Sequence, residues 1–229
     1  MVDFQQRLGF TFHNPDLLKQ ALTHSSYLNE NKEQAPVSNE RLEFLGDALL
    51  GLIIAEKLYN DFPQYTEGEM TQIRAALVKG DTLCKIAKVM NLGDFLIFGK
   101  GEEATGGRDK SANLESALEA VIAAVYLDQG LLLTRELVLR LFAEEIEKAI
   151  KRTAVIDYKS KLQEVMQGEC RRAPVYILIN EAGSEHERQF TVDVKLDDRV
   201  LGRGIGRSKK AAEAEAARTA LERLSLHKT

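Results

Sequence analysis

Three carboxylates that could bind a cation lie close together in the segment "NERLEFLGDALL", residues 39–50. Glu40, Glu43 and Asp47 are spaced by three and four residues, which places them within roughly 60° of one another on an α-helix. An opposite, apolar face is predicted to pack into a core, and it comprises Leu42, Leu45, Leu49, Leu52 and Ile53. The acidic stripe is therefore either a solvated helix start or a cation site or interaction surface.

A further carboxylate, Glu119, lies inside the apolar stretch "SALEAVIAAVYLD". A carboxylate in a mostly buried helix must be paired, neutral or bound to a cation. If Glu119 meets the acidic stripe, the like charges require a counter-charge. A hard divalent cation with oxygen ligands is the natural one, and Mg²⁺ or Mn²⁺ suits such a site. A di-iron bundle would need Glu-x-x-His pairs, which the sequence lacks. Glu67, in "QYTEGEM", by itself indicates only a helix start.

Charge divides the 229 residues into two parts. Residues 1–153 carry 17 Lys and Arg against 23 Asp and Glu, whereas residues 154–229 carry 14 against 12. The net charge of −4 therefore hides a basic C-terminal part that could bind nucleic acid. No apolar run approaches a membrane span, and Cys84 and Cys170 suggest neither a disulfide nor a zinc site. These features predict a cytoplasmic protein without membrane association.

The predicted secondary structure that positions these residues changes along the chain. Apolar residues recur every three to four positions up to about residue 153, which predicts helices at 15–27, 41–59, 68–90, 113–130 and 132–150 and a polar loop at 99–110. Beyond that point the pattern predicts a helix at 157–168, strands at 175–180, 187–196 and 199–206, and a final helix at 208–224.

The segment "NERLEFLGD" resembles the nine-residue signature of the bacterial ribonuclease III family. The segments "ALTHSSY", "EGEMTQIRAALV", "LEAVIAAVYLD" and "DYKSKLQE…GRSKKAAEAEAA" resemble family segments in the right order. The resemblance implies an all-α catalytic and dimerisation domain at residues 1–150 and a linker at 151–156. An α+β double-stranded-RNA-binding domain, with the order α-β-β-β-α, is then expected at 157–226.

What the resemblance implies for function is an endonuclease that hydrolyses double-stranded RNA to 5′-phosphate and 3′-hydroxyl ends, as in the processing of ribosomal RNA precursors. The enzyme is expected to be a homodimer that uses Mg²⁺, with Mn²⁺ as a substitute, and no small-molecule cofactor. By resemblance, Glu43, Asp47 and Glu119 hold the metal, and Asp47, Glu119, Glu40 and Glu67 are the catalytic acids. Phe44 is implied to be a dimer contact.

One position departs from the family pattern. Ser116 stands three residues before Glu119, where the family usually has aspartate, so one ligand carboxylate is missing. Glu115 is adjacent, but neighbouring helix positions differ by about 100°, so we expect that it does not simply replace the aspartate. A water could fill the gap, the metal could bind more weakly, or activity could be reduced; retained activity is expected. The alternative is a noncatalytic regulator that binds double-stranded RNA.

The basic C-terminal part resembles a double-stranded-RNA-binding domain, which recognises duplex shape through phosphates and 2′-hydroxyls. Ser208, Lys209 and Lys210 open the last helix, where backbone N–H groups and ammonium groups attract phosphate. The resemblance further implies contacts from Ser160, Gln163 and Glu164 and from His186. Further candidate phosphate contacts are Arg171, Arg172, Arg203 and Arg207.

Overall fold

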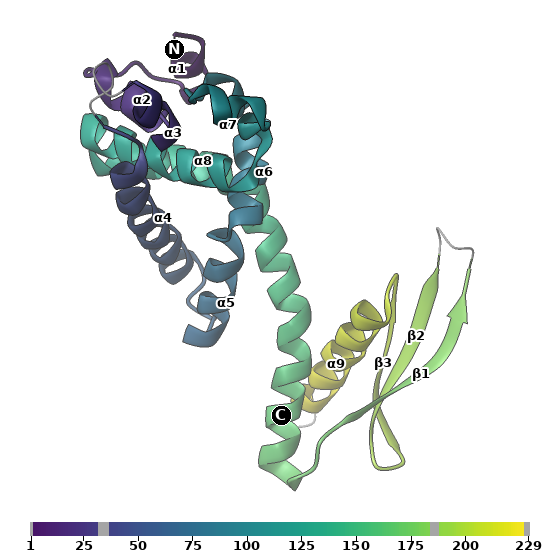
Figure 1. Cartoon of the computed structure of the whole chain (residues 1–229). Helices are drawn as coiled ribbons and strands as arrows, with labels where there is room; N and C mark the ends of the chain where they lie inside the picture. Colours follow the sequence, from purple (N-terminus) through teal and green to yellow (C-terminus); the bar gives the residue numbers. More distant parts are fainter. Residues whose placement is uncertain (1, 32–36, 184–187, 227–229) are drawn as a thin grey trace. The chain divides into compact units, whose positions relative to one another are not determined.

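A computed structural model describes residues 2–31, 37–183 and 188–226 of the chain (Figure 1). The chain forms two compact units, Met1–Ala149 and Ile150–Thr229. The first unit is helical, and the second combines helices with a three-stranded sheet. This architecture confirms the predicted fold class.

The helical unit starts with short helices and ends in a long one. Its elements are α1 (Val2–Leu8), α2 (Pro15–Ala21), α3 (Ser25–Glu30), α4 (Glu40–Asp61), α5 (Glu67–Leu77), α6 (Gly80–Val89), η1 (Leu92–Phe95), α7 (Lys100–Ala104), η2 (Gly107–Asp109) and the first part of α8 (Ser111–Cys170). The prediction of one helix at 68–90 is wrong, because the chain turns at Val78 and Lys79 between α5 and α6. The predicted loop at 99–110 contains α7 and η2.

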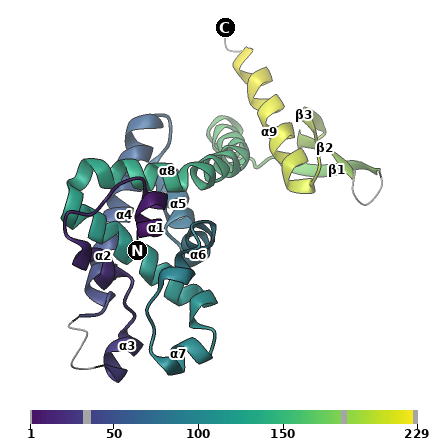
Figure 2. The same cartoon turned by 90° about the horizontal axis from the view of Figure 1, so that it is seen from above.

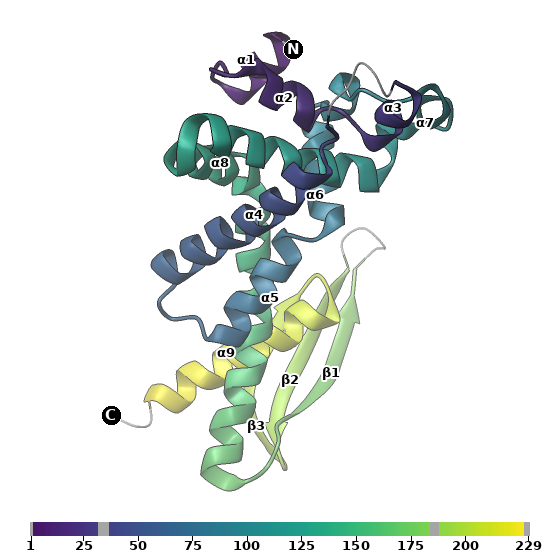
Figure 3. The ribbon, with the colours of Figure 1, turned by 60° about the vertical axis from the view of Figure 1, so that its left-hand side comes forward.

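The first part of α8 forms the centre of the helical unit. In Figure 1 and again in Figure 3 it runs between the N-terminal helices and the pair α4 and α5. Residues 120–125 are all 0% exposed. Residues 111–151 are long and apolar enough to cross a membrane, but this burial identifies the segment as a core helix. At Gly130 the backbone leaves helical geometry, with φ 80° and ψ 177°.

The second unit packs a helix on an antiparallel sheet with the order β1-β2-β3. Its strands are β1 (Val175–Ala182), β2 (Gln189–Leu196) and β3 (Arg199–Gly206), and α9 (Lys209–Leu226) lies against β2 and β3 (Figure 2). Leu162 and Met166, from the last part of α8, join the same core. The α-β-β-β-α order predicted from the sequence is confirmed.

Glycines on β3 explain how close α9 comes to the sheet. A Cβ atom added to Gly202 would lie 2.3 Å from the carbonyl oxygen of Ala216, and one added to Gly204 would lie 2.2 Å from the Ala216 nitrogen. Alanines of α9 therefore face these glycines, and a larger residue at either glycine position would push the helix away. This packing holds the start of α9 next to the end of β3.

Candidate functional site

The acidic stripe of α4 lies where α4 meets α8 at very short range. Gly46 is buried at this crossing, and its backbone packs directly against the backbone of Glu119. Asp47 directly follows Gly46, and Glu43 lies three residues before Gly46. Both acids therefore lie near Glu119. The crossing therefore brings together three of the residues predicted to bind a metal.

The Glu119 side chain is an unpartnered carboxylate in the interior. The residue is only 6% exposed, and none of the described residues gives its carboxylate a hydrogen bond or an ion pair. Burial, followed by the negative charges of Asp47, Glu115 and Glu43, raises its pKa to about 8. At neutral pH this group is protonated unless a cation is bound beside it.

Glu115 also belongs to this group of acids. Burial, followed by the charges of Glu43, Asp81 and Asp47, raises the pKa of Glu115 above its usual range. Glu115 and Ser116 are adjacent and so differ by about 100° on the helix. The position of Glu115 relative to Glu119 is the relevant one, because residues four apart lie on the same face of a helix. The four-residue spacing of Glu115 and Glu119 in the sequence could therefore have indicated that Glu115 lies with these acids.

Glu40 and Glu67 are not among the charges that shift the Glu119 pKa. Glu40, at the exposed start of α4, accepts a 2.6 Å hydrogen bond from the Ser38 hydroxyl. Glu67 accepts a 3.0 Å hydrogen bond from Thr71 at the start of α5. A capping box, formed by Thr66 and Glu69, fixes this helix start. Within this chain the structure therefore joins Glu43, Asp47, Glu115 and Glu119, and leaves Glu40 and Glu67 outside that group.

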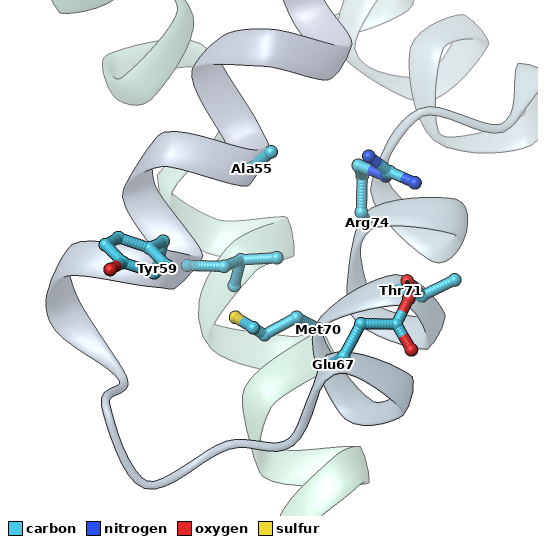
Figure 4. Close-up of a pocket in the computed structure, with 7 residues that line it drawn as sticks. Ala55, Tyr59, Glu67, Met70, Thr71 and Arg74 are labelled. Carbon is cyan, nitrogen blue, oxygen red and sulfur yellow. Dashed lines mark hydrogen bonds between the residues drawn. The ribbon is translucent and has the colours of Figure 1, made fainter.

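Glu67 instead lines a hollow of about 240 Å³ between α4 and α5 (Figure 4). The hollow is mostly apolar, with charge at its edge, and it is lined by Ala55, Leu58, Tyr59, Glu67, Met70, Thr71 and Arg74. In Figure 4 the Tyr59 and Met70 side chains lie on the side of the hollow away from Arg74. An apolar side chain from outside could fill this space.

An exposed apolar stripe runs along α4. Phe44, Leu52 and Tyr59 are 81%, 57% and 73% exposed. Their spacing places them within roughly 80° of one another on the helix. The prediction that Leu52 is buried is wrong, because its position belongs to this stripe. Exposed apolar side chains along one helix face make this face a candidate interaction surface.

The chemistry of these acids suits a hard divalent cation, although their side chains are not arranged as a complete set of metal ligands. In the described parts of the chain, no three carboxylate, histidine or cysteine side chains are arranged so that they could hold a metal ion. The donors are nevertheless all oxygens, and the like charges lie near one another without a basic partner for Glu119. A cation would relieve both the burial and the repulsion of these carboxylates.

Candidate RNA contacts on α8 lie on the solvent side of the second unit. Ser160, Gln163 and Glu164 are exposed, whereas Leu162 and Met166 are buried in the core. The predicted contact His186 lies outside the described residues. The exposed face of this helix is thus available to a ligand.

The start of α9 presents the two lysines to solvent. The Ser208 hydroxyl accepts a 3.2 Å hydrogen bond from the Ala211 N–H and so caps the helix. Lys209 and Lys210 are exposed, and neither forms an ion pair with any residue that the structure describes. Free ammonium groups at a helix N-terminus are suited to phosphate.

Two of the candidate arginines have other partners. Arg203 donates hydrogen bonds of 2.6 and 2.8 Å to the two carboxylate oxygens of Asp193, which is 2% exposed. Arg172 pairs with Asp197. Arg203 therefore stabilises the sheet by neutralising a buried carboxylate, and the sequence alone did not indicate this.

Comparisons with known families cover both units. A family model described as "Ribonuclease-III-like" matches residues 14–146, and one described as "Double-stranded RNA binding motif" matches residues 158–224. Together the two matches take in most of the chain.

Relatives of known name match the chain along nearly its whole length. Ribonuclease 3 of Dehalococcoides mccartyi (strain CBDB1) is 47% identical over 222 residues, which cover 97% of this chain and 94% of the relative. Ribonuclease 3 of Pseudothermotoga lettingae is 43% identical over 227 residues, with 98% and 95% covered. A solved nuclease domain of ribonuclease III from Campylobacter jejuni, whose description mentions a region involved in dimer formation, is 40% identical and superposes with a TM-score of 0.57. That match covers 62% of this chain and 94% of the solved one.

Proposed function

The chain belongs to the ribonuclease III family, and from this membership we infer that it is an endoribonuclease that cleaves double-stranded RNA. The helical unit corresponds to the nuclease part of the family, and the second unit corresponds to its duplex-binding part. Hydrolysis to 5′-phosphate and 3′-hydroxyl ends is the reaction we propose for it.

We propose that Glu43, Asp47 and Glu119 hold a divalent cation, with Mg²⁺ as the natural ion and Mn²⁺ as a substitute. The observation that carries this proposal is the Glu119 carboxylate, which is buried beside two other acids without a partner in the described chain. When bound, such a cation lowers the pKa of a water molecule and stabilises negative charge on the phosphate. The carboxylates hold the ion, and no serine, cysteine or histidine nucleophile is needed.

Asp47 and Glu119 are proposed to act at the scissile phosphate, with Glu40 and Glu67 as further acids there. Glu40 and Glu67 lie apart from the Glu119 group within one chain, so a second copy is the proposed means of completing the site. The proposed homodimer forms through the apolar stripe of α4. Phe44 of one copy would enter the hollow that Glu67 lines in the other (Figure 4).

The duplex is proposed to bind across the exposed face of α8, at Ser160, Gln163 and Glu164, and at the start of α9, at Ser208, Lys209 and Lys210. His186 remains a proposed contact from the sequence alone. The domain limits of 1–150, 151–156 and 157–226 also remain proposals, as do a cytoplasmic location and ribosomal RNA precursors as substrates.

The test is cleavage of a long RNA duplex by the whole chain, with Mg²⁺, with EDTA, and by Glu119→Gln with Mg²⁺. We expect staggered fragments only from the unchanged chain with Mg²⁺. Exposed Glu136, elsewhere on α8, supplies the matched control Glu136→Gln, which should cleave normally. Cleavage that persists in EDTA, or in Glu119→Gln, would contradict the proposed metal site.

The second candidate is a noncatalytic regulator that binds double-stranded RNA, and Ser116 is the observation that favours it. This candidate predicts that the unchanged chain binds duplex but never cuts it under any metal condition. In that case Ser116→Asp is expected to restore cleavage. Cleavage by the unchanged chain would eliminate this candidate.

A further inference from the structure

Glu115 is a carboxylate directly before Ser116, the residue that stands where the family usually has aspartate. It stands four residues before Glu119 on α8, so the two side chains share a helix face. Glu119 lies where α8 touches α4 backbone to backbone, and Glu115 precedes it by one helical turn. The half-buried Glu115 side chain therefore lies near the acids of α4, whose charges act on it as they act on Glu119.

The packing around Glu115 leaves it room but no partner. A Cβ atom added to Gly80, at the start of α6, would lie 2.3 Å from one Glu115 carboxylate oxygen. Lys79, the N-cap residue of α6, forms no side-chain capping bond, and no hydrogen bond among the described residues joins an α6 N–H to Glu115. Among the described residues, no hydrogen bond or ion pair reaches the Glu115 carboxylate. The neighbouring Asp81 adds a further negative charge.

A partly buried carboxylate surrounded by other acids is unfavourable without a counter-charge. Glu119, which is 6% exposed and unpartnered, supplies an independent sign that this counter-charge comes from outside the described chain. We propose that Glu115 provides the carboxylate that Ser116 lacks and completes the cation site with Glu43, Asp47 and Glu119. The longer glutamate side chain, placed one residue earlier, takes over the part of the family's aspartate. This inference rests on the proposed metal-dependent function.

The first test measures Mn²⁺ binding to the whole chain by calorimetry without RNA, so that its readout does not depend on cleavage. Glu115→Gln should weaken Mn²⁺ binding by roughly tenfold or more, because one charged ligand is lost. Adding Ser116→Asp to Glu115→Gln should restore most of the affinity, since the carboxylate returns at the family position. Glu136→Gln, on the exposed side of α8, should bind Mn²⁺ like the unchanged chain.

The second test separates metal binding from a purely structural role. In EDTA the melting temperature of Glu115→Gln should equal or exceed that of the unchanged chain, because a repelled charge has been removed. A lower melting temperature in EDTA, together with unchanged Mn²⁺ affinity, would assign Glu115 to the packing of α6 and overturn the inference.

The two proposals can fail separately. If Glu119→Gln abolishes Mn²⁺ binding while Glu115→Gln leaves it intact, the Glu115 inference is wrong and the metal-dependent nuclease stands. If the unchanged chain binds no Mn²⁺ and cleaves RNA in EDTA, the metal-dependent function itself is wrong.

Discussion

A Cβ atom added to Gly46 would lie 1.9 Å from the carbonyl oxygen of Glu119, so α4 and α8 touch backbone to backbone. No side chain separates the two helices at this point. The contact sets how far Glu43 and Asp47 lie from Glu119. Glycine at this position is therefore a requirement of the acidic site as well as of the core.

Gly46→Ala tests this requirement. The added methyl group must push α4 from α8, and we expect the free energy of unfolding to fall by about 1–3 kcal/mol. Cleavage should fall further than stability explains, because the acids separate. Gly68→Ala is the matched control, since a Cβ there meets nothing within 4 Å and an alanine favours the helix. Urea unfolding and single-turnover cleavage of both variants provide the comparison, and a fully active, stable Gly46→Ala would refute the argument.

Phe44→Lys is expected to disrupt the proposed dimer. Phe44 is 81% exposed in one chain, and burying it in a second copy would remove a large aromatic surface from water. Sedimentation equilibrium at micromolar concentration should give the mass of two chains for the unchanged protein and of one chain for Phe44→Lys. Val89→Lys, at a residue of similar exposure (78%) on α6, is the control and should remain dimeric. A single-chain mass for the unchanged protein would contradict the prediction.

Lys209 and Lys210 are predicted to bind phosphate. Replacing each with glutamine should weaken duplex binding at every sequence and reduce the slope of log affinity against log salt by about one per lysine. The fold should persist, because both side chains are exposed. Lys88→Gln, at an exposed lysine of the helical unit, should leave binding and its slope unchanged. Fluorescence anisotropy at several salt concentrations measures the slope, and an unaltered slope in the α9 variants would remove these lysines from the interface.

The Asp193–Arg203 pair predicts how the second unit responds to acid. The hydrogen bonds and charge of Arg203 lower the pKa of Asp193 below its ordinary value of 3.8. The folded state therefore binds this proton more weakly than the unfolded state does. The stabilisation is fully present above the unfolded pKa and is lost as pH falls through the lower, folded pKa.

Asp193→Asn should remove this loss of folding stability at low pH. At neutral pH the variant should also be less stable, by about 1.5–3 kcal/mol, because charged hydrogen bonds from Arg203 are lost. Urea unfolding followed by the amide NMR signals of β2, from pH 7 down to pH 3, would measure both effects. Asp198→Asn, at an exposed carboxylate beside β3, should behave like the unchanged chain. Equal acid sensitivity in Asp193→Asn and the unchanged chain would show that other groups govern the transition.

The sequence by itself determined that a helical part precedes an α-β-β-β-α part, and it determined the chemistry of the acids. Helical spacing places Glu43 and Asp47 on one face regardless of surroundings, because the angle between residues of one helix follows from its geometry. The change from helical to alternating periodicity likewise identified the second unit. The strand at 199–206 was predicted with the bounds that the structure has.

The tertiary structure alone decided which residues of different helices meet. It placed Leu52 on an exposed stripe, divided residues 68–90 into α5 and α6, and paired Arg203 with Asp193. It also brought Glu115 beside the acids of α4 and left Glu40 and Glu67 outside that group. Distances between helices depend on what packs between them, and here a glycine without a side chain lets α4 and α8 touch. Spacing along one chain segment cannot determine such a contact, because it results from the packing of two segments far apart in sequence.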